Sequence, residues 1–113
     1  MPLKRIARYL FPSQIPRELA TKVFERDHFT CQYCGLDGRQ SLANWMILTI
    51  DYVHPYAGGG PRRSDNLVTA CQPCNLIKGK RKFASKEEAT RYVHAKREEL
   101  ARQYEEQMRP RAY

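Results

Sequence analysis

The spacing of apolar positions along the chain predicts a small α+β fold. Apolar residues recur every three to four positions after Pro16, a favourable first helical position, which predicts a short amphipathic helix ending near Asp27. Residues 45–53, WMILTIDYV, are rich in β-branched and aromatic side chains and predict a strand. Residues 67–70 predict a second short strand, and the polar, turn-rich residues 35–44 predict a loop before the first one.

Two further helices are predicted in the second half of the chain. Residues 75–81 follow directly on a Cys-x-x-Cys pair and predict a short helix. Ser85 can cap a longer helix, because Glu88 three residues later completes a capping box. The apolar face and balanced charge of this last helix favour a role in packing or in homodimerisation. Its apolar residues are Ala89, Tyr92, Val93, Leu100, Tyr104 and Met108.

Length bounds the chain to one small domain. It has 113 residues and a mass of 13.3 kDa. We expect a central domain at residues 15–84, preceded by a basic arm at residues 1–14 and followed by the amphipathic C-terminal helix at residues 85–113.

Positive charge is concentrated in the first three quarters of the chain. Twenty Lys and Arg against twelve Asp and Glu give a formal charge of +8, and residues 1–84, with thirteen basic and six acidic residues, contribute +7 of it. A surface of this kind is either simply well solvated or binds an anionic partner, and clustered charge favours the phosphates of a nucleic acid. The clusters are Lys4, Arg5 and Arg8; Arg62 and Arg63; and Lys78, Lys80, Arg81 and Lys82.

The sequence also argues against a membrane partner. No apolar run approaches the roughly 18–20 residues that a membrane helix needs. The N-terminal residues are basic but contain no apolar stretch long enough for a secretory signal. We therefore expect a cytoplasmic protein.

All four cysteines fall in two Cys-x-x-Cys pairs, Cys31 with Cys34 and Cys71 with Cys74, separated by 36 residues. Two residues between thiolates allow both to bind one tetrahedral Zn2+ from a single turn, at roughly 2.3 Å each. The alternatives are two disulfides or a redox pair, but no secretory signal is present and two symmetrical pairs exceed what redox chemistry needs. The spacing predicts a structural zinc ion, because protein ligands fill all four positions.

Residues 49–81 carry a second set of motifs. They read TIDYVHPYAGGGPRRSDNLVTACQPCNLIKGKR, which places a strand, a glycine loop, Asn-Leu and Cys-x-x-Cys-Asn-x-x-Lys in succession. This order and spacing closely resemble the HNH endonucleases, and the resemblance extends over residues 17–82. It implies a zinc-stapled ββα-metal domain, in which a hairpin packed on a short helix holds one divalent cation, Mg2+ or Mn2+, against a phosphodiester of DNA.

The resemblance also implies roles for individual residues. Asp51 and Asn75 would be the protein ligands of the catalytic cation, in keeping with the preference of a hard cation for oxygen. Asn66 would brace the loop and orient the general base, and Lys78 would face the same phosphate. The implied activity is hydrolysis or nicking of DNA. The DNA backbone would be held by Arg62, Arg63, Lys78, Lys80, Arg81 and Lys82.

One position departs from the family pattern. The residue after Asp51 is normally the histidine that activates water, and here it is Tyr52, whose phenol, with a pKa of about 10, is a poor base at neutral pH. His54 lies two residues further on, on the same face of an extended strand. Three alternatives follow: His54 acts as a displaced base, Tyr52 activates water or attacks the phosphate itself, or the domain binds DNA without cutting it.

Four other side chains carry weaker expectations. Trp45 and Met46 are expected in the core of the first strand, and His94 is expected to face solvent from the last helix. Tyr33, inside the first Cys-x-x-Cys pair, can either pack on the zinc site or stack on DNA.

Overall fold

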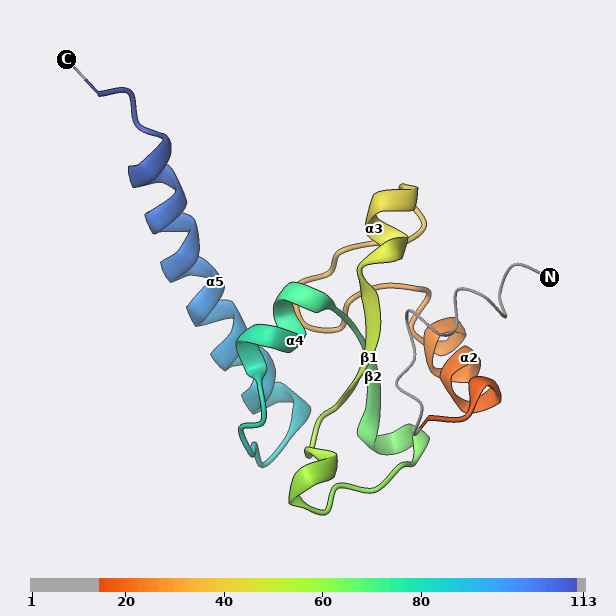
Figure 1. The fold of residues 1–113 in the computed structure, drawn as a ribbon. Coiled ribbons are helices and arrows are strands. Elements are labelled where there is room, and N and C mark those ends of the chain that lie inside the picture. Colours follow the sequence, from red (N-terminus) through yellow and green to blue (C-terminus); the bar gives the residue numbers. More distant parts are fainter. Residues whose placement is uncertain (1–14, 112–113) are drawn as a thin grey trace.

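The computed structural model describes residues 15–111, so the basic arm predicted at residues 1–14 lies outside the described residues. Within the described range no helix is long and apolar enough to cross a membrane. The combination of helices with one small sheet confirms the predicted α+β fold class. In chain order the elements are α2 (Arg17–Arg26), α3 (Leu42–Met46), β1 (Leu48–Tyr52), the 3-10 turns η1 (Tyr56–Gly58) and η2 (Ser64–Asn66), β2 (Leu67–Cys71), α4 (Gln72–Lys78) and α5 (Lys86–Met108) (Figure 1).

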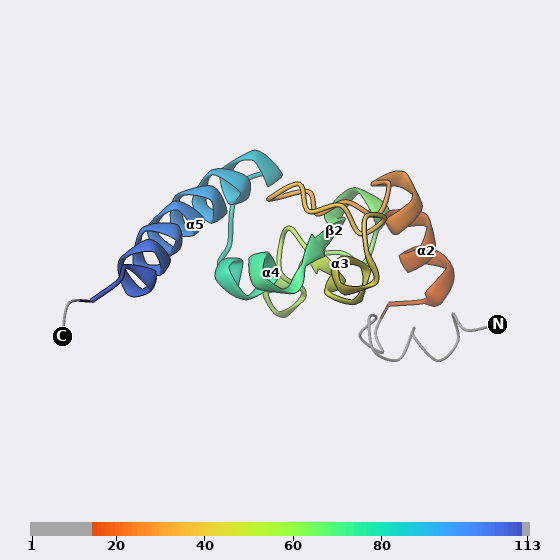
Figure 2. The same ribbon diagram turned by 90° about the horizontal axis from the view of Figure 1, so that it is seen from above.

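An antiparallel hairpin of β1 and β2 lies at the centre of the domain, in a register that pairs Leu48 with Cys71. Because side chains alternate along a strand, the hairpin has two faces. The face with Leu48 and Ile50 packs against α2. The opposite face, with Val68 and Ala70, packs against the Cys-x-x-Cys segments and α5. Helix α2 therefore lies on one side of the hairpin, and α4 and α5 lie on the other (Figures 1 and 2).

The first strand is shorter than predicted. The Ser41 side chain accepts a hydrogen bond from the Asn44 N–H (3.0 Å) and caps a helical turn, α3, immediately before β1. The strand prediction for Trp45 and Met46 was therefore wrong, as was the loop prediction for the three residues that begin α3. Met46 is 55% exposed and does not belong to the core.

Helix α4 begins earlier than predicted. Its first residue is Gln72, because Cys71 is its N-cap and Pro73 is tolerated in the first turn, where a helix leaves backbone N–H groups unpaired. Asn75 is consequently the fourth residue of the helix and not the first.

Helix α5 begins as the capping box predicts. The Ser85 side chain accepts the N–H of Glu88 (3.1 Å). Ala89 and Val93, near the start of the helix, are buried, whereas the outer part is exposed and projects away from the domain (Figure 1). Homodimerisation through this outer part stays a prediction. Its exposed apolar side chains are Leu100, Tyr104 and Met108.

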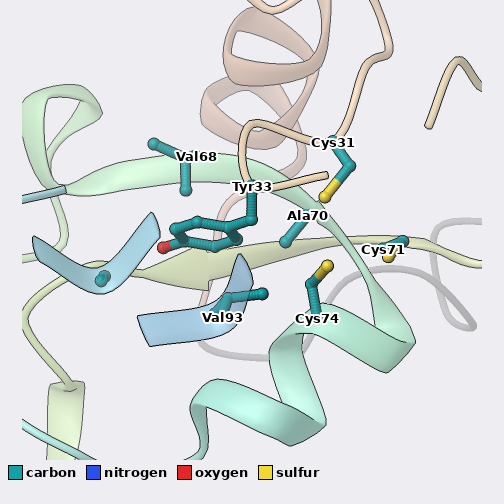
Figure 3. Close-up of a cluster of buried hydrophobic side chains, with 8 residues drawn as sticks. Cys31, Tyr33, Val68, Ala70, Cys71, Cys74 and Val93 are labelled. Atoms are coloured by element: carbon teal, nitrogen blue, oxygen red, sulfur yellow. The ribbon is translucent and has the colours of Figure 1, made fainter. Parts of the chain in front are cut away.

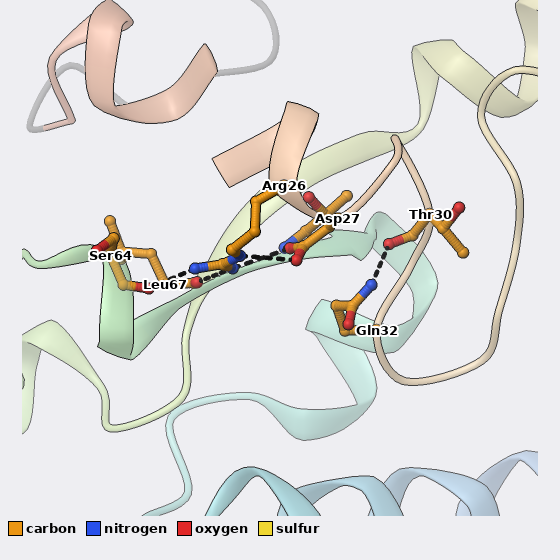
Figure 4. A network of polar contacts seen from close by, with 7 residues as sticks. Arg26, Asp27, Thr30, Gln32, Ser64 and Leu67 are labelled. Atoms are coloured by element: carbon orange, nitrogen blue, oxygen red, sulfur yellow. Dashed lines mark hydrogen bonds and ion pairs between the residues drawn. The ribbon is translucent and has the colours of Figure 1, made fainter. Parts of the chain in front are cut away.

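An ion pair at the end of α2 joins that helix to β2. Arg26 donates from Nε to Asp27 (2.9 Å) and from its terminal nitrogens to the carbonyl oxygens of Ser64 (2.7 Å) and Leu67 (2.7 Å). Asp27, which is 8% exposed, accepts the N–H of Thr69 (2.8 Å). Figure 4 shows Arg26 lying between Asp27 and the start of β2. The pair therefore holds the hairpin against α2.

We expect Asp27→Ala to lower the free energy of unfolding by about 2–3 kcal/mol, because it removes the acceptor of a buried N–H and leaves a guanidinium without its carboxylate. Asp65→Ala is the matched control, since Asp65 pairs with Arg63 at 3.4 Å while both side chains are 71% exposed, and such pairs contribute little. Urea denaturation measures both variants. Equal, small losses in the two would show that the Arg26–Asp27 pair is not structural.

Candidate functional site

The four cysteines converge between the two Cys-x-x-Cys segments. Their sulfur atoms all lie within 4.8 Å of one another, the Sγ atoms of Cys34 and Cys71 are 3.7 Å apart, and all four are free thiols. A tetrahedral zinc ion with bonds of about 2.3 Å requires sulfur atoms about 3.8 Å apart. In Figure 3 the sulfurs of Cys31, Cys71 and Cys74 gather at one point. The four cysteines can thus hold a zinc ion, and the two-disulfide alternative is contradicted.

Local hydrogen bonds shape the first Cys-x-x-Cys segment. The Gly35 N–H donates to the Cys31 carbonyl oxygen (2.9 Å), with Gly35 at a φ of +81° that favours glycine. The Cys34 N–H lies 3.5 Å from the Cys31 sulfur and donates to it. Hydrogen bonds from the thiols of Cys71 and Cys74 lower the pKa of the Cys31 thiol. The contacts to the Cys31 sulfur stabilise its thiolate, which is the form that binds a metal, whereas the hydrogen bonds to Cys31 raise the pKa of the Cys71 and Cys74 thiols.

Helix α5 contacts the cysteine cluster directly. Arg97 Nη1 donates to the Cys74 sulfur (3.4 Å), and Val93 belongs to the same buried cluster as the cysteines. His94 does not simply face solvent as predicted, because its Nε2 hydrogen-bonds the Tyr33 carbonyl oxygen. Four thiolates around Zn2+ carry a net charge of −2, so the Arg97 guanidinium offsets part of the charge of a loaded site.

Asp51 lies in a second polar cluster, beside the first. Its carboxylate is buried, accepts a hydrogen bond from the Tyr33 hydroxyl (2.6 Å) and lies 3.3 Å from Lys78 Nζ. The Lys78 side chain is fully buried, and its ammonium also donates to the Tyr52 carbonyl oxygen (2.9 Å). Burial raises the pKa of the Asp51 carboxyl, against the opposing effects of Lys78 and Tyr33. We call Tyr33, Asp51 and Lys78 the carboxylate cluster.

The Tyr33 phenol is a hydrogen-bond donor in this cluster and remains protonated. Burial is the main reason that its pKa is raised, and the negative charge of Asp51 raises it further. Because Tyr33 is 2% exposed, the alternative in which it packs beside the zinc site is confirmed, and the alternative in which it stacks on DNA was wrong.

A pocket of about 310 Å3 opens between β1, the loop after it and α4. It brings together three of the predicted site residues, Asp51, Tyr52 and Asn75. Tyr52 is one of the described residues that line the pocket, and His54 is not. The lining consists of Ile50, Asp51, Tyr52, Pro55, Tyr56, Ala57, Asn75, Gly79 and Lys80.

Asn66 holds the loop between the two strands. Its side chain accepts the His54 N–H (2.9 Å) and donates to the carbonyl oxygens of His54 (3.0 Å) and Pro61 (2.9 Å). The loop is tight at Gly60, where a Cβ atom would lie only 1.8 Å from the His54 carbonyl oxygen. Asn66 therefore braces the loop and fixes the backbone of His54, whose side chain is half-buried.

The segment that contains the cysteines, the hairpin and α4 also has a recognisable sequence. Residues 31–81 match the family model described as HNH endonuclease. This part of the chain is therefore similar to the HNH endonucleases. The four cysteines fit the paired Cys-x-x-Cys segments of that family.

One curated relative is similar to part of the chain. A stretch of 55 residues is 42% identical to the "Type 4 apparatus protein DotN" of Legionella pneumophila, and it covers 47% of this chain and 21% of that protein. The chain thus spans about a fifth of the length of this relative. No solved structure gave a significant match.

Two residues of the carboxylate cluster, Asp51 and Lys78, had been given other roles by the HNH resemblance. Lys78 was expected to face the phosphate, but in this structure its ammonium is buried and paired with Asp51. Asp51 was expected to bind the cation, but its Oδ2 already contacts both the Tyr33 hydroxyl and the Lys78 ammonium. A buried carboxylate needs such partners, since an unpaired charge is costly to bury.

Tyr52 occupies the base position of the HNH motif. Its ring packs at a tilt against Tyr56, with ring centroids 5.5 Å apart. Burial raises the pKa of the Tyr52 phenol, while the nearby Arg62 guanidinium opposes that shift. The phenol is therefore an even poorer base at neutral pH than a free tyrosine.

The remaining basic residues predicted to contact DNA are exposed. Arg62 lies over the Tyr56 ring at 5.7 Å, and Lys80 lines the pocket. Lys82 lies against the glycine loop, because a Cβ atom on Gly58 would be 2.8 Å from its Cε. One cation thus lines the pocket, and two others contact Tyr56 and Gly58 in the loop beside it. The full exposed set is Arg62, Arg63, Lys80, Arg81 and Lys82.

Sequence reasoning missed two contributors to these sites. Arg97 interrupts the row of apolar residues along the last helix. A charged residue on the packed face of a helix needs a partner, and here that partner is the Cys74 sulfur. Nothing in the local sequence indicates that the Tyr33 hydroxyl reaches Asp51, since the two residues lie on separate segments.

We expect Arg97→Gln to weaken zinc binding about tenfold, because outer contacts of this kind orient metal ligands and balance their charge. Competition with a chromogenic chelator measures the affinity. Arg102→Gln, an exposed change on the same helix, is the matched control. Equal affinities for the two variants would contradict a role of Arg97 at the zinc centre.

We expect Lys78→Met to lower the free energy of unfolding by about 3–5 kcal/mol, because it leaves the Asp51 carboxylate buried without its cation. Adding Asp51→Asn should recover much of that loss, since no charge then remains unpaired. Urea denaturation of both variants, with the exposed Lys80→Met as control, tests this. Additive losses in the double variant would contradict the Asp51–Lys78 pairing.

Proposed function

We propose that this HNH domain binds DNA without hydrolysing it. The observation that carries the proposal is the pairing of Asp51 with Lys78 at 3.3 Å. A divalent cation at Asp51 would compete with an ammonium for the same carboxylate oxygen, and repulsion between two buried positive charges is strong where the dielectric is low. A Mg2+ or Mn2+ ion on Asp51 and Asn75 is therefore disfavoured.

The base position supports the same proposal. Tyr52 lines the pocket but is protonated at neutral pH, and general bases work best with a pKa near the operating pH. His54, the displaced base considered above, has its backbone fixed by Asn66 and is not among the described residues that line the pocket.

DNA binding is supported by the charge that remains on the surface. Lys78 is removed from this surface by burial, but the five other predicted contact residues are exposed. Lys80 lines the pocket, and Arg62 and Lys82 contact the loop beside it. Phosphate contacts from such residues position a nucleic-acid backbone without reading its sequence.

The competing function is that of an active HNH nuclease that cuts or nicks DNA. It is favoured by one observation, the meeting of Asp51, Tyr52 and Asn75 at one pocket. An active nuclease would require Lys78 to leave the carboxylate when a cation arrives.

Plasmid nicking with Mg2+ or Mn2+ distinguishes the two functions. We expect the wild type to leave supercoiled DNA intact, at the same background as Asn75→Ala. Tyr52→His should not gain activity, because Lys78 still occupies Asp51. Cleavage by the wild type above the Asn75→Ala background would overturn the proposal, and His54→Ala would then test the displaced base.

Binding itself is measured by fluorescence anisotropy with labelled DNA at several salt concentrations. We expect the double variant Lys80→Ala, Lys82→Ala to bind more weakly and to reduce the salt slope by roughly two, about one for each phosphate contact. Arg102→Ala on the exposed part of α5 is the control and should bind as the wild type does. An unchanged salt slope in the double variant would contradict the assigned surface.

A further inference from the structure

We propose that the pocket beside β1 and α4 takes an unpaired base of a nucleic-acid strand, while the cations at its opening hold the neighbouring phosphates. This inference rests on the proposed function and deepens it, because it names the form of nucleic acid that the site accepts. The position at which the HNH motif would hold its cation would instead bind a flat, largely apolar ring.

The walls of the pocket suit such a ring better than they suit a hydrated cation. Apolar side chains of Ile50, Pro55 and Ala57 line it together with Tyr52 and Tyr56. Its volume of about 310 Å3 is at the lower end of the roughly 300–1,000 Å3 that is typical of small-molecule pockets. The carboxylate of Asp51 is the one acidic group of the lining, and Lys78 neutralises it.

Tyr56 is the side chain that would contact the base. It is 51% exposed, and its ring contacts Tyr52 at a tilt, with centroids 5.5 Å apart, while the Arg62 guanidinium lies over it at 5.7 Å. An exposed aromatic ring with a fixed orientation loses little conformational entropy when it binds. Aromatic rings are the usual partners of bases in single-stranded nucleic acids.

Polar groups around the ring complete the match. The Asn75 amide, which has both donors and an acceptor, lines the pocket and can hydrogen-bond the edge of a base. Lys80 lines the pocket, Lys82 lies against the glycine loop, and Arg62 lies over Tyr56. A strand that places a base in the pocket therefore passes its phosphates over three cations.

This arrangement favours single strands over duplexes. In a duplex every base is paired and stacked, so entry into a pocket costs the free energy of extrusion. In a single strand that cost is small. We therefore expect tighter binding to a single-stranded oligonucleotide than to a duplex of the same length and charge at one salt concentration.

The test is fluorescence anisotropy with a short labelled single strand and with the same strand carrying one abasic position at its centre. We expect Tyr56→Ala to bind the intact strand about tenfold more weakly than the wild type. Tyr56→Phe should retain affinity because it keeps the ring, and Tyr104→Ala removes another exposed tyrosine, on α5, as the matched control. The abasic strand should lose affinity for the wild type but little for Tyr56→Ala. Circular dichroism and zinc content check that the variants are folded.

Failure of this inference is distinguishable from failure of the proposed function. If the wild type binds DNA and Tyr56→Ala binds both strands equally well, the base pocket is overturned while DNA binding stands. Preference for the duplex would overturn it in the same way. If the wild type binds neither the single strands nor the duplex at low salt, the proposed function itself is wrong.

Discussion

The convergence of four sulfur atoms is the constraint on which the rest of the structure depends. A two-stranded hairpin is marginal in water, and a chain of this size buries a small core. The cysteines connect the turn after α2 to the end of β2 and the start of α4, and the packed part of α5 closes over them. A metal bound there supplies cohesion that apolar burial alone does not provide in a domain this small.

The carboxylate cluster links this metal centre to the hairpin. Tyr33 lies between the first two cysteines, Asp51 lies on β1 and Lys78 is the last residue of α4, so three elements meet at one buried carboxylate. A group that a nuclease would expose to a cation is here neutralised inside the protein. The positive charge available to a nucleic acid is consequently that of the exposed basic residues, which are Arg62, Arg63, Lys80, Arg81 and Lys82. The pocket is largely apolar.

Much of the fold could be predicted because its signals act within a few residues. The capping box at Ser85 and the two Cys-x-x-Cys spacings each describe one turn of chain, and the corresponding features are present. The prediction failed at Trp45 and Met46, where strand-like composition was given more weight than the cap at Ser41. Composition describes how a segment packs, whereas a cap determines whether its first turn closes.

Sequence patterns identify which groups are available: four cysteines at zinc-binding spacing, the HNH motif with tyrosine at its base position, and an excess of positive charge before the last helix. Which of these groups neutralise one another depends on the three-dimensional packing. Lysine is rarely buried unless it is paired, so Lys78 was expected at the surface. The packing of α4 on β1 instead places its ammonium 3.3 Å from Asp51. Burial and pairing depend on contacts between segments that are distant in the sequence, so they cannot be predicted from the residues that neighbour Lys78 along the chain.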